Sequence, residues 1–263
     1  MRKNFYVVGN LKMNMLSREE AAQYLVVLKR ELQGKQYKHV TGVVCPPFLY
    51  LSRFDGLPTG IKKGAQNFFP EKSGAYTGEI SPLMLKDDGV EYVIVGHSER
   101  RQYAGETDVV AREKVLSALK HLLIPIVCIG ETKAERRAEE TEDVLEMQVK
   151  TIFSDLSKLQ AEKIIVAYEP RWAIGTDQLP TTEELLQVRI LLLKLFTEMF
   201  GARTAEHIAV LYGGSVKSSF LPAVSFEARM DGVLVGRESL FPYELVKMMD
   251  ILEKEAERQN KEE

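Results

Sequence analysis

The sequence predicts an α/β protein that folds as a single closed (β/α)8 barrel. One pattern recurs eight times along the 263 residues: a short β-branched run, a turn with Gly or Pro, and a longer stretch of helical periodicity. Most of the short runs are almost continuously apolar, as expected of parallel strands covered by helices. No long Pro-, Gly- or Ser-rich linker interrupts residues 1–263. The length also allows two smaller domains, and a doubly wound sheet is the alternative architecture.

The expected strands are short segments rich in Val, Ile and other apolar residues. They are Phe5–Gly9, Val40–Val44, Ile61–Ala65, Tyr92–Val95, Ile124–Ile129, Ile164–Tyr168, Ile208–Tyr212 and Gly232–Val235. Because stretches with helical periodicity separate them, we expect each strand to run parallel to the next.

The expected helices are longer segments whose apolar residues recur at helical spacing. The clearest are Ser17–Leu32, Asp108–His121, Glu135–Phe153, Thr182–Phe200 and Tyr243–Arg258. Several are preceded by Ser, Thr or Asp, whose side chains accept hydrogen bonds from the free N–H groups of a first helical turn. The Glu- and Lys-rich end after Leu252 predicts a solvated, fraying helix without a function of its own.

Composition and charge exclude several classes of partner. The 35 Lys and Arg residues nearly balance the 38 Asp and Glu residues, and neither sign gathers in one half of the chain. We therefore expect no nucleic-acid or anionic-membrane partner. No apolar segment approaches the ~20 residues that span a bilayer, and no signal-peptide pattern opens the sequence, so we expect a cytoplasmic protein. Cys45 and Cys128 form neither a disulfide framework nor a metal-site spacing, so we expect two reduced thiols and no metal.

Polar residues follow five of the expected strands, at the positions where the βα loops begin. They are Asn10 and Lys12 after the first strand, Gly96–Arg100 after the fourth, Glu169 and Pro170 after the sixth, Gly213–Ser215 after the seventh, and Gly236 and Arg237 after the eighth. Barrel enzymes carry their catalytic residues at these ends of the strands. A closed barrel would therefore bring a cation, an imidazole, a carboxylate and two glycine-bearing turns to one rim.

Each of these residues alone has an ordinary structural explanation. Lys12 could be a solvated lysine, Glu169 a loop carboxylate, and His97 a hydrogen-bonded structural histidine. The glycines could simply serve turns that need a positive φ. Their convergence from different βα units is what indicates an active site.

Motifs along nearly the whole chain resemble the triosephosphate isomerase family, in the order in which the family has them. They are Gly9–Asn14 (GNLKMN), Gly64–Asn67 (GAQN), Gly74–Ile80 (GAYTGEI), Val95–Arg101 (VGHSERR), Val127–Thr132 (VCIGET), Ala167–Pro170 (AYEP), Trp172–Thr176 (WAIGT), Tyr212–Lys217 (YGGSVK) and Asp231–Gly236 (DGVLVG). The resemblance implies a TIM barrel and an isomerase of glycolysis and gluconeogenesis without a cofactor. Its reaction would interconvert dihydroxyacetone phosphate and D-glyceraldehyde 3-phosphate.

The resemblance also implies an acid–base pair. Glu169 would be the base that moves a proton between adjacent carbons of the substrate. His97 would be the electrophile, which donates a hydrogen bond to the substrate oxygen and stabilises the enediolate. The Ser98–Arg101 stretch after it suits a helical turn, whose amino terminus disfavours a charged imidazolium, so a neutral ring is reasonable.

Three further residues complete the polar part of the implied site. By the match to the family, Lys12 is also catalytic and places a fixed positive charge against the phosphate and the enediolate. Asn10 would help to hold the substrate. Glu99 is expected to organise Lys12 and the rim without taking part in the chemistry.

Backbone N–H groups in glycine-bearing turns would hold the phosphate, because such clusters let the chain approach an anion closely. By position in the family's motifs, the contacts come from Gly175, Ser215, Gly236 and Arg237. The segment Pro170–Pro180 would form a lid that closes over the substrate and excludes water.

Three positions depart from the usual family pattern. Arg171 replaces an apolar residue, Asp177 stands where the lid usually has glycine, and Arg237 stands where a second glycine usually follows. Arg237 keeps its backbone N–H, while its guanidinium either attracts phosphate or points to solvent. Nearby, we expect Trp172 to pack at the lid hinge and Cys128 to be a buried packing residue.

The long segment Gln66–Glu79 predicts a partner, since a loop of this length needs a function of its own. The resemblance implies a homodimer in which this loop inserts into a twofold-related subunit. Thr77 would then approach the neighbour's Asn10 and Lys12.

Two other functions stay open at this point. One is a barrel isomerase that acts on another phosphosugar. The lid and Tyr212–Ser215 argue against it, because they look sized for a three-carbon phosphate. The other is a non-catalytic dimeric scaffold. The joint presence of Lys12, His97 and Glu169 argues against the scaffold, which would need none of them.

Overall fold

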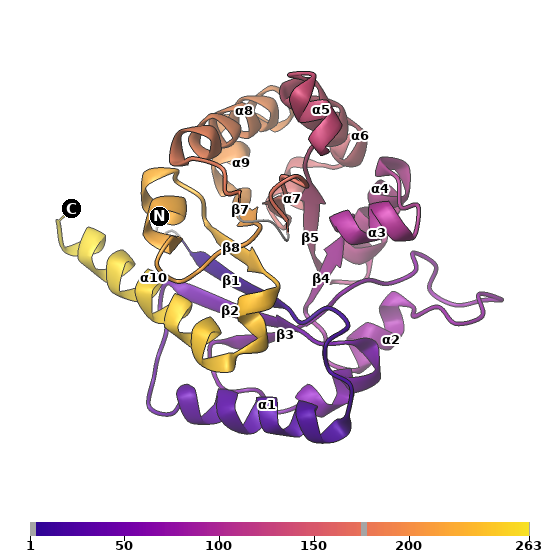
Figure 1. Ribbon diagram of the computed structural model, residues 1–263. Coiled ribbons are helices and arrows are strands. Elements are labelled where there is room, and N and C mark those ends of the chain that lie inside the picture. Colours follow the sequence, from indigo (N-terminus) through magenta and orange to yellow (C-terminus); the bar gives the residue numbers. More distant parts are fainter. Residues whose placement is uncertain (1–3, 175–177, 263) are drawn as a thin grey trace.

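The computed structural model describes residues 4–174 and 178–262, and its strands close into a parallel barrel (Figure 1). The strands are β1 (Phe5–Asn10), β2 (Val40–Cys45), β3 (Ile61–Ala65), β4 (Tyr92–Val95), β5 (Ile124–Ile129), β6 (Ile165–Tyr168), β7 (Ala209–Gly213) and β8 (Gly232–Val235). Each pairs with the next in the chain, and β8 pairs with β1. The predicted (β/α)8 fold is therefore confirmed. Each strand begins and ends within one residue of its predicted first and last residues.

Helices surround the barrel and supply its outer layer (Figure 1). They are α1 (Arg18–Glu31), η1 (Phe48–Phe54), α2 (Pro82–Asp87), α3 (Ser98–Tyr103), α4 (Asp108–Lys120), α5 (Lys133–Arg137), α6 (Thr141–Phe153), α7 (Lys158–Ala161), α8 (Thr182–Phe200), α9 (Ala202–His207), η2 (Ala223–Glu227), η3 (Arg237–Leu240) and α10 (Pro242–Glu262). Ser17, Thr107 and Thr181 cap α1, α4 and α8 as expected. The stretch after β2 departs from the repeated pattern, because it holds only the short 3-10 helix η1.

The prediction of one helix over Glu135–Phe153 is wrong. The chain forms α5 and α6 instead, with a break at residues 138–140. At the break Glu139 has a φ of +60°, and the N–H of Glu140 donates to the carbonyl of Glu135 at 3.0 Å. A left-handed residue with this bond ends a helix in the same way as the usual terminal glycine.

The predicted helix after Leu252 is confirmed, but the expectation that its residues are solvated is wrong for Glu253 and Ala256. The segment is helical, but the side chain of Glu253 is buried and accepts hydrogen bonds from the backbone N–H groups of Lys38 and His39, at 2.8 and 3.0 Å. Ala256, one turn further on, is buried as well. This end of α10 therefore anchors the chain where it enters β2.

The core has two layers, because alternate strand residues face opposite sides of the barrel wall. Val8, Ile94, Ile126 and Leu211 are among the residues that fill the barrel interior. Val7 belongs to the outer layer, between the strands and the helices. Burial on both faces explains why the strands read as continuous apolar runs. Within residues 4–174 and 178–262, no helix has the length and apolarity needed to cross a membrane.

Candidate active site

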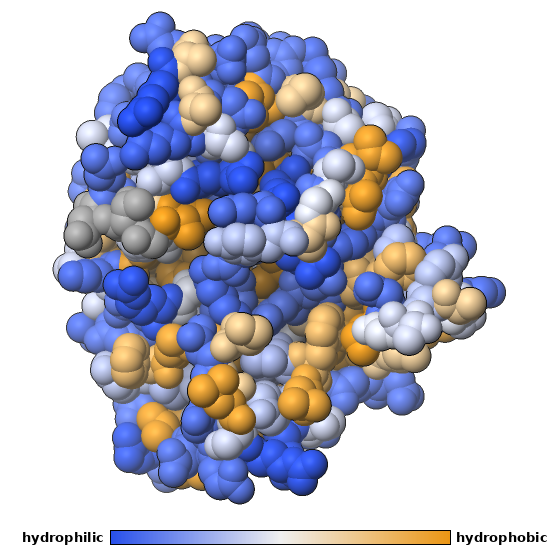
Figure 2. All heavy atoms as spheres, turned by 45° about the vertical axis from the view of Figure 1, so that its right-hand side comes forward, coloured by the Kyte–Doolittle hydropathy of each residue, from blue (hydrophilic) through white to orange (hydrophobic). Residues whose placement is uncertain are grey.

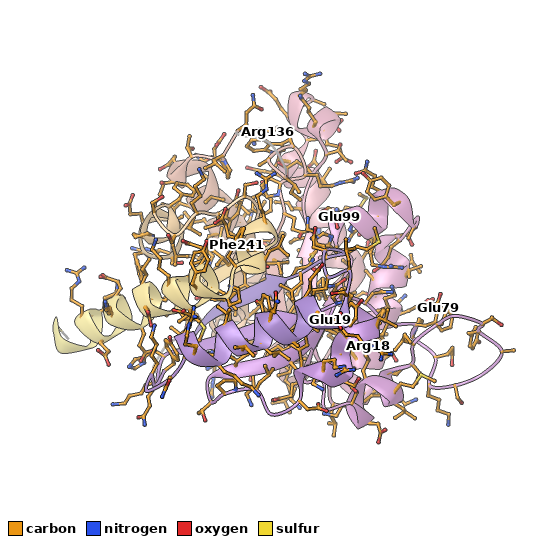
Figure 3. The ribbon with its side chains drawn as sticks, turned by 60° about the horizontal axis from the view of Figure 1, so that its bottom comes forward. Arg18, Glu19, Glu79, Glu99, Arg136 and Phe241 are labelled. Atoms are coloured by element: carbon orange, nitrogen blue, oxygen red, sulfur yellow. The ribbon has the colours of Figure 1, made fainter. Side chains whose placement is uncertain are left out.

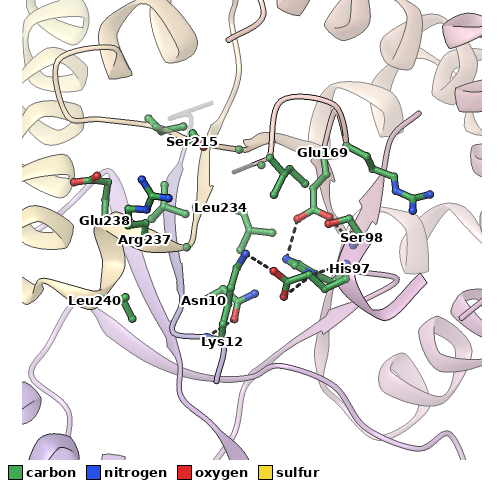
Figure 4. A pocket seen from close by; sticks show the side chains of 18 of the residues that line it. Asn10, Lys12, His97, Ser98, Glu169, Ser215, Leu234, Arg237, Glu238 and Leu240 are labelled. Carbon is green, nitrogen blue, oxygen red and sulfur yellow. Dashed lines mark hydrogen bonds and ion pairs between the residues drawn. The ribbon is translucent and has the colours of Figure 1, made fainter. Parts of the chain in front are cut away.

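A pocket of about 700 Å³ opens at the carboxyl ends of the strands (Figure 4). The loops that follow β1, β4, β6, β7 and β8 line it. It brings together the predicted site residues Asn10, Lys12, His97, Glu169, Ser215, Gly236 and Arg237. The remaining predicted contact, Gly175, lies outside the described residues, as does Asp177.

The backbone of Lys12 is strained, and hydrogen bonds to neighbouring residues hold it in place. Its φ is +50°, in the left-handed region that residues other than glycine rarely occupy. The side chain of Asn10 accepts its backbone N–H at 3.0 Å, and the amide of Gln66 donates to its carbonyl at 2.9 Å. Its Nζ lies 2.6 Å from Oε1 of Glu99. Glu99 therefore organises the lysine as expected, and the cation is positioned before any ligand arrives.

Because Gly236 has no side chain, there is room for the side chain of Lys12 to cross the pocket. A Cβ built on Gly236 would lie 2.9 Å from Cε of Lys12, too close for ordinary packing. The turn after β8 thus touches the lysine that follows β1. Asn10, which ends β1, keeps its amide nitrogen free of any acceptor in the described part of the chain, so this donor is available to a ligand.

His97 is oriented by the start of α3. Its Nδ1 accepts a hydrogen bond from the backbone N–H of Glu99 at 3.2 Å. An Nδ1 that accepts an N–H carries no proton, so the neutral ring bears its proton on Nε2. Nε2 lies 3.2 Å from Oε1 of Glu169. The imidazole therefore presents a hydrogen-bond donor beside the predicted base.

Glu169 follows β6, and its side chain is almost fully buried. Its Oε2 accepts the backbone N–H of Ser98 at 2.9 Å. Two glycines make room for it: a Cβ on Gly213 would lie 2.7 Å from its Cγ, and a Cβ on Gly130 would lie 1.9 Å from its carbonyl oxygen. Both the main chain and the carboxylate of Glu169 are therefore closely confined.

Cys128 is buried inside the barrel, as expected of a packing residue. Burial raises the pKa of its thiol well above the usual value, and the negative charge of Glu169 raises it further. Because the thiolate is the nucleophilic form, this environment suits packing and not nucleophilic chemistry.

Sequence reasoning gave no role to Glu131, which anchors the start of the predicted lid. Its fully buried carboxylate accepts hydrogen bonds from the Tyr168 hydroxyl at 3.1 Å and from Nε1 of Trp172 at 2.7 Å. Burial raises the pKa of Glu131 even though these bonds act in the opposite direction. Arg136 lies over the Trp172 ring, 4.1 Å from its centroid. The hinge role expected of Trp172 fits these contacts.

Sequence reasoning also missed Glu106, which supports the residue before His97. Its Oε1 accepts the N–H of Gly96 at 2.8 Å, and its Oε2 lies 2.8 Å from Arg100 and 2.6 Å from Lys114. Burial alone would raise the pKa of Glu106, but these cations and the N–H lower it more, so it lies below its usual value. A charged cluster thus fixes the end of β4.

The turns after β7 and β8 present unused backbone donors to the pocket. Within the described ranges, the N–H groups of Gly214, Ser215, Gly236 and Arg237 have no hydrogen-bond acceptor. The turns lie side by side because β7 and β8 are paired. Clustered N–H groups of this kind bind anions such as phosphate. Arg237 adopts no positive φ, so its Cβ is tolerated there.

The site therefore combines a buried carboxylate, a neutral imidazole donor, a fixed cation and an anion cradle. The described residues contain no cluster of three or more His, Cys, Asp or Glu side chains that could hold a metal ion. Such a set can move a proton between carbons of a phosphorylated carbonyl compound.

Comparisons with known proteins agree with this geometry. The family model described as triosephosphate isomerase matches residues 5–252. The triosephosphate isomerase of Alkaliphilus oremlandii is 45% identical over 242 residues, which cover 91% of this chain and 96% of that protein. The triosephosphate isomerase of Moorella thermoacetica is 45% identical over 89% of this chain and 93% of its own length. The chain belongs to the triosephosphate isomerase family.

Proposed function

We propose that this protein interconverts dihydroxyacetone phosphate and D-glyceraldehyde 3-phosphate through an enediolate. Membership of the family supports the reaction. The observation that carries the assignment of roles is the 3.2 Å approach of His97 Nε2 to the Glu169 carboxylate, inside a pocket that also holds Lys12. Base, electrophile and cation thus face the same space.

Glu169 begins the reaction as the base. Its carboxylate removes a proton from the carbon next to the carbonyl, and the electrons of the broken C–H bond form the C=C bond of the enediolate. The carbonyl oxygen becomes negative and accepts a hydrogen bond from Nε2–H of His97. The former carbonyl oxygen takes up a proton by way of His97 Nε2, and the hydroxyl oxygen on the other carbon gives up its own proton and becomes the new carbonyl. The first proton then returns from Glu169 to the neighbouring carbon, so the reaction needs no oxidant or reductant.

Lys12 and Asn10 hold the substrate while the proton moves. The ammonium of Lys12 stabilises the phosphate in the ground state and the enediolate in the transition state. The free amide nitrogen of Asn10 adds a hydrogen bond to the substrate. Both residues belong to the strained turn after β1, whose backbone is already fixed.

The phosphate occupies the cradle after β7 and β8. Ser215, Gly236 and Arg237 contribute backbone N–H groups, and the family resemblance adds Gly175 from the lid Pro170–Pro180. The substrate thereby spans the pocket, with its reacting carbons near Glu169 and its phosphate near the two glycine-bearing turns.

We further propose a cytoplasmic homodimer in which residues 1–263 form one domain. The loop Gln66–Glu79 extends away from the barrel (Figures 1 and 2), and Figure 3 labels Glu79 on it. Met13 and Leu16 are 86% and 78% exposed in the adjoining β1–α1 loop, to which Gln66 is hydrogen-bonded. Such exposed apolar side chains suit burial by a second copy. With a net charge of −3, we propose no nucleic-acid partner.

A coupled assay tests the reaction. Purified protein given D-glyceraldehyde 3-phosphate is expected to produce dihydroxyacetone phosphate, which an NADH-dependent dehydrogenase then reduces. Folded protein that gives no turnover would overturn the proposal.

A further inference from the structure

Four cationic and three anionic side chains line the pocket within the described residues; they are Lys12, Arg171, Lys217 and Arg237, and Glu99, Glu169 and Glu238. Lys12 is paired with Glu99, and Glu169 is held by His97 and Ser98. Arg237 also lines the pocket, but its guanidinium has no hydrogen bond or ion pair to any described residue. An arginine at a ligand pocket with all its side-chain donors unused is available to bind an anion.

The backbone around Arg237 is firmly placed. Ser239, which is fully buried, donates its hydroxyl to the carbonyl of Gly236 at 2.6 Å. The hydroxyl of Tyr24 in turn donates to the carbonyl of Ser239 at 2.9 Å. Arg237 therefore leaves a fixed turn, although its own side chain is exposed.

The direction of the side chain also favours a ligand contact. In Figure 4 the guanidinium of Arg237 lies on the side that faces the Ser215 turn, and the carboxylate of its neighbour Glu238 points away from it. The guanidinium thus borders the same space as the unused N–H groups of Ser215, Gly236 and Arg237 itself.

We propose that the Arg237 guanidinium binds the substrate phosphate directly, in addition to the backbone N–H groups of the two turns. This inference rests on the proposed function, since it places the phosphate in the cradle after β7 and β8. A guanidinium presents a planar fork of N–H groups that matches two phosphate oxygens at once. Because the side chain is exposed, the contact is strongest at low ionic strength.

The test is equilibrium binding of glycerol 3-phosphate, measured by calorimetry at about 0.02 M and about 0.5 M salt. This probe has three carbons and a phosphate but no carbonyl, so its binding does not depend on turnover. The variants are Arg237→Gln, which removes the charge, and Arg237→Lys, which keeps the charge but loses the fork. Arg203→Gln removes the same charge from α9, which precedes β7 and so lies at the opposite end of the barrel.

At low salt, Arg237→Gln is expected to weaken binding by about fivefold, and Arg237→Lys by less. The advantage of the wild type should shrink at high salt, and Arg203→Gln should bind as the wild type does. Equal dissociation constants for the wild type and Arg237→Gln at both salt concentrations would overturn the inference. Equal weakening by Arg203→Gln would overturn it too. The effect would then come from the electrostatic field of the whole protein and not from a direct contact between Arg237 and the phosphate.

These measurements distinguish a failure of the proposed reaction from a failure of the proposed phosphate contact. If the wild type binds glycerol 3-phosphate with the expected dependence on Arg237 but does not isomerise D-glyceraldehyde 3-phosphate, the phosphate contact stands and the reaction is wrong. Circular dichroism and thermal melting of each variant confirm that it is folded before binding is compared.

Discussion

The two walls of the pocket are built differently. The wall after β1, β4 and β6 carries Lys12, His97 and Glu169, and each of these side chains is already held by other groups of the protein. The wall after β7 and β8 carries Ser215 and Arg237, which are exposed and whose backbone donors are unused. We call them the catalytic wall and the phosphate wall.

The two walls therefore have different functions. Proton transfer depends on distances of about 3 Å, and other groups of the protein already hold the side chains of the catalytic wall in place. The phosphate wall needs only unpaired donors, and the ligand itself completes their hydrogen bonds. Changes on the catalytic wall should therefore reduce kcat, and changes on the phosphate wall should weaken binding.

The largest effect is expected from Glu169→Asp, which withdraws the carboxylate by one methylene. A displacement of about 1 Å can cost ~100-fold in rate, so kcat should fall by about that factor or more. Steady-state kinetics and glycerol 3-phosphate binding measure the two quantities separately. The dissociation constant should stay within about tenfold of the wild-type value.

A matched control for this variant is Glu198→Asp, on the exposed face of α8, which should change neither quantity. Near-normal turnover of Glu169→Asp would remove Glu169 from the role of base. Weakened binding in proportion to the lost rate would remove the division between the walls.

Lys12→Met is expected to affect both walls, because the lysine faces the phosphate and the enediolate. The substitution keeps the bulk of the side chain but deletes its charge, so kcat should fall and KM should rise, each by about tenfold. Steady-state kinetics over a range of substrate concentrations separate the two. Wild-type values of both constants would contradict the assigned role.

The substitution Gly213→Ala should disturb Glu169 from the phosphate wall, with a smaller effect on kcat than Glu169→Asp. The residue belongs to β7, yet its added Cβ would meet Cγ of Glu169 at 2.7 Å. The Glu169 side chain must move out of this contact, so kcat should fall by about tenfold while glycerol 3-phosphate binding changes little. If binding falls and kcat does not, β7 serves only the phosphate wall. Thermal melting checks that the variant is folded.

Much of the fold could be predicted from the sequence, because burial on both faces leaves a strong signal in the strands. The break between α5 and α6 could not, since Glu139 ends the helix in a left-handed conformation without the glycine that usually marks it. The role of Glu253 was also hidden. A glutamate in a charged helical end gives no sign that its carboxylate caps the chain before β2.

The residues of the candidate site also fall into those that could be predicted from the sequence and those that could not. Lys12, His97 and Glu169 were predictable because each lies within two residues of the end of a strand and within a motif of the family. The residues that support them were not. Gln66 and Glu106 act through partners distant in the sequence or through backbone atoms, and side chains of their types occur everywhere on a protein surface. Only the folded chain brings these partners together.

Isomerisation of D-glyceraldehyde 3-phosphate in D2O, followed by NMR of the product, tests whether Glu169 carries the proton between the two carbons. If Glu169 carries the proton as a carboxylic acid, some of that proton exchanges with solvent, and deuterium appears on the carbon that receives it. The Glu169→Asp variant should place deuterium on the same carbon, only more slowly. Product formed by the wild type without any deuterium would indicate a direct transfer of hydrogen between the carbons, and would contradict the base mechanism.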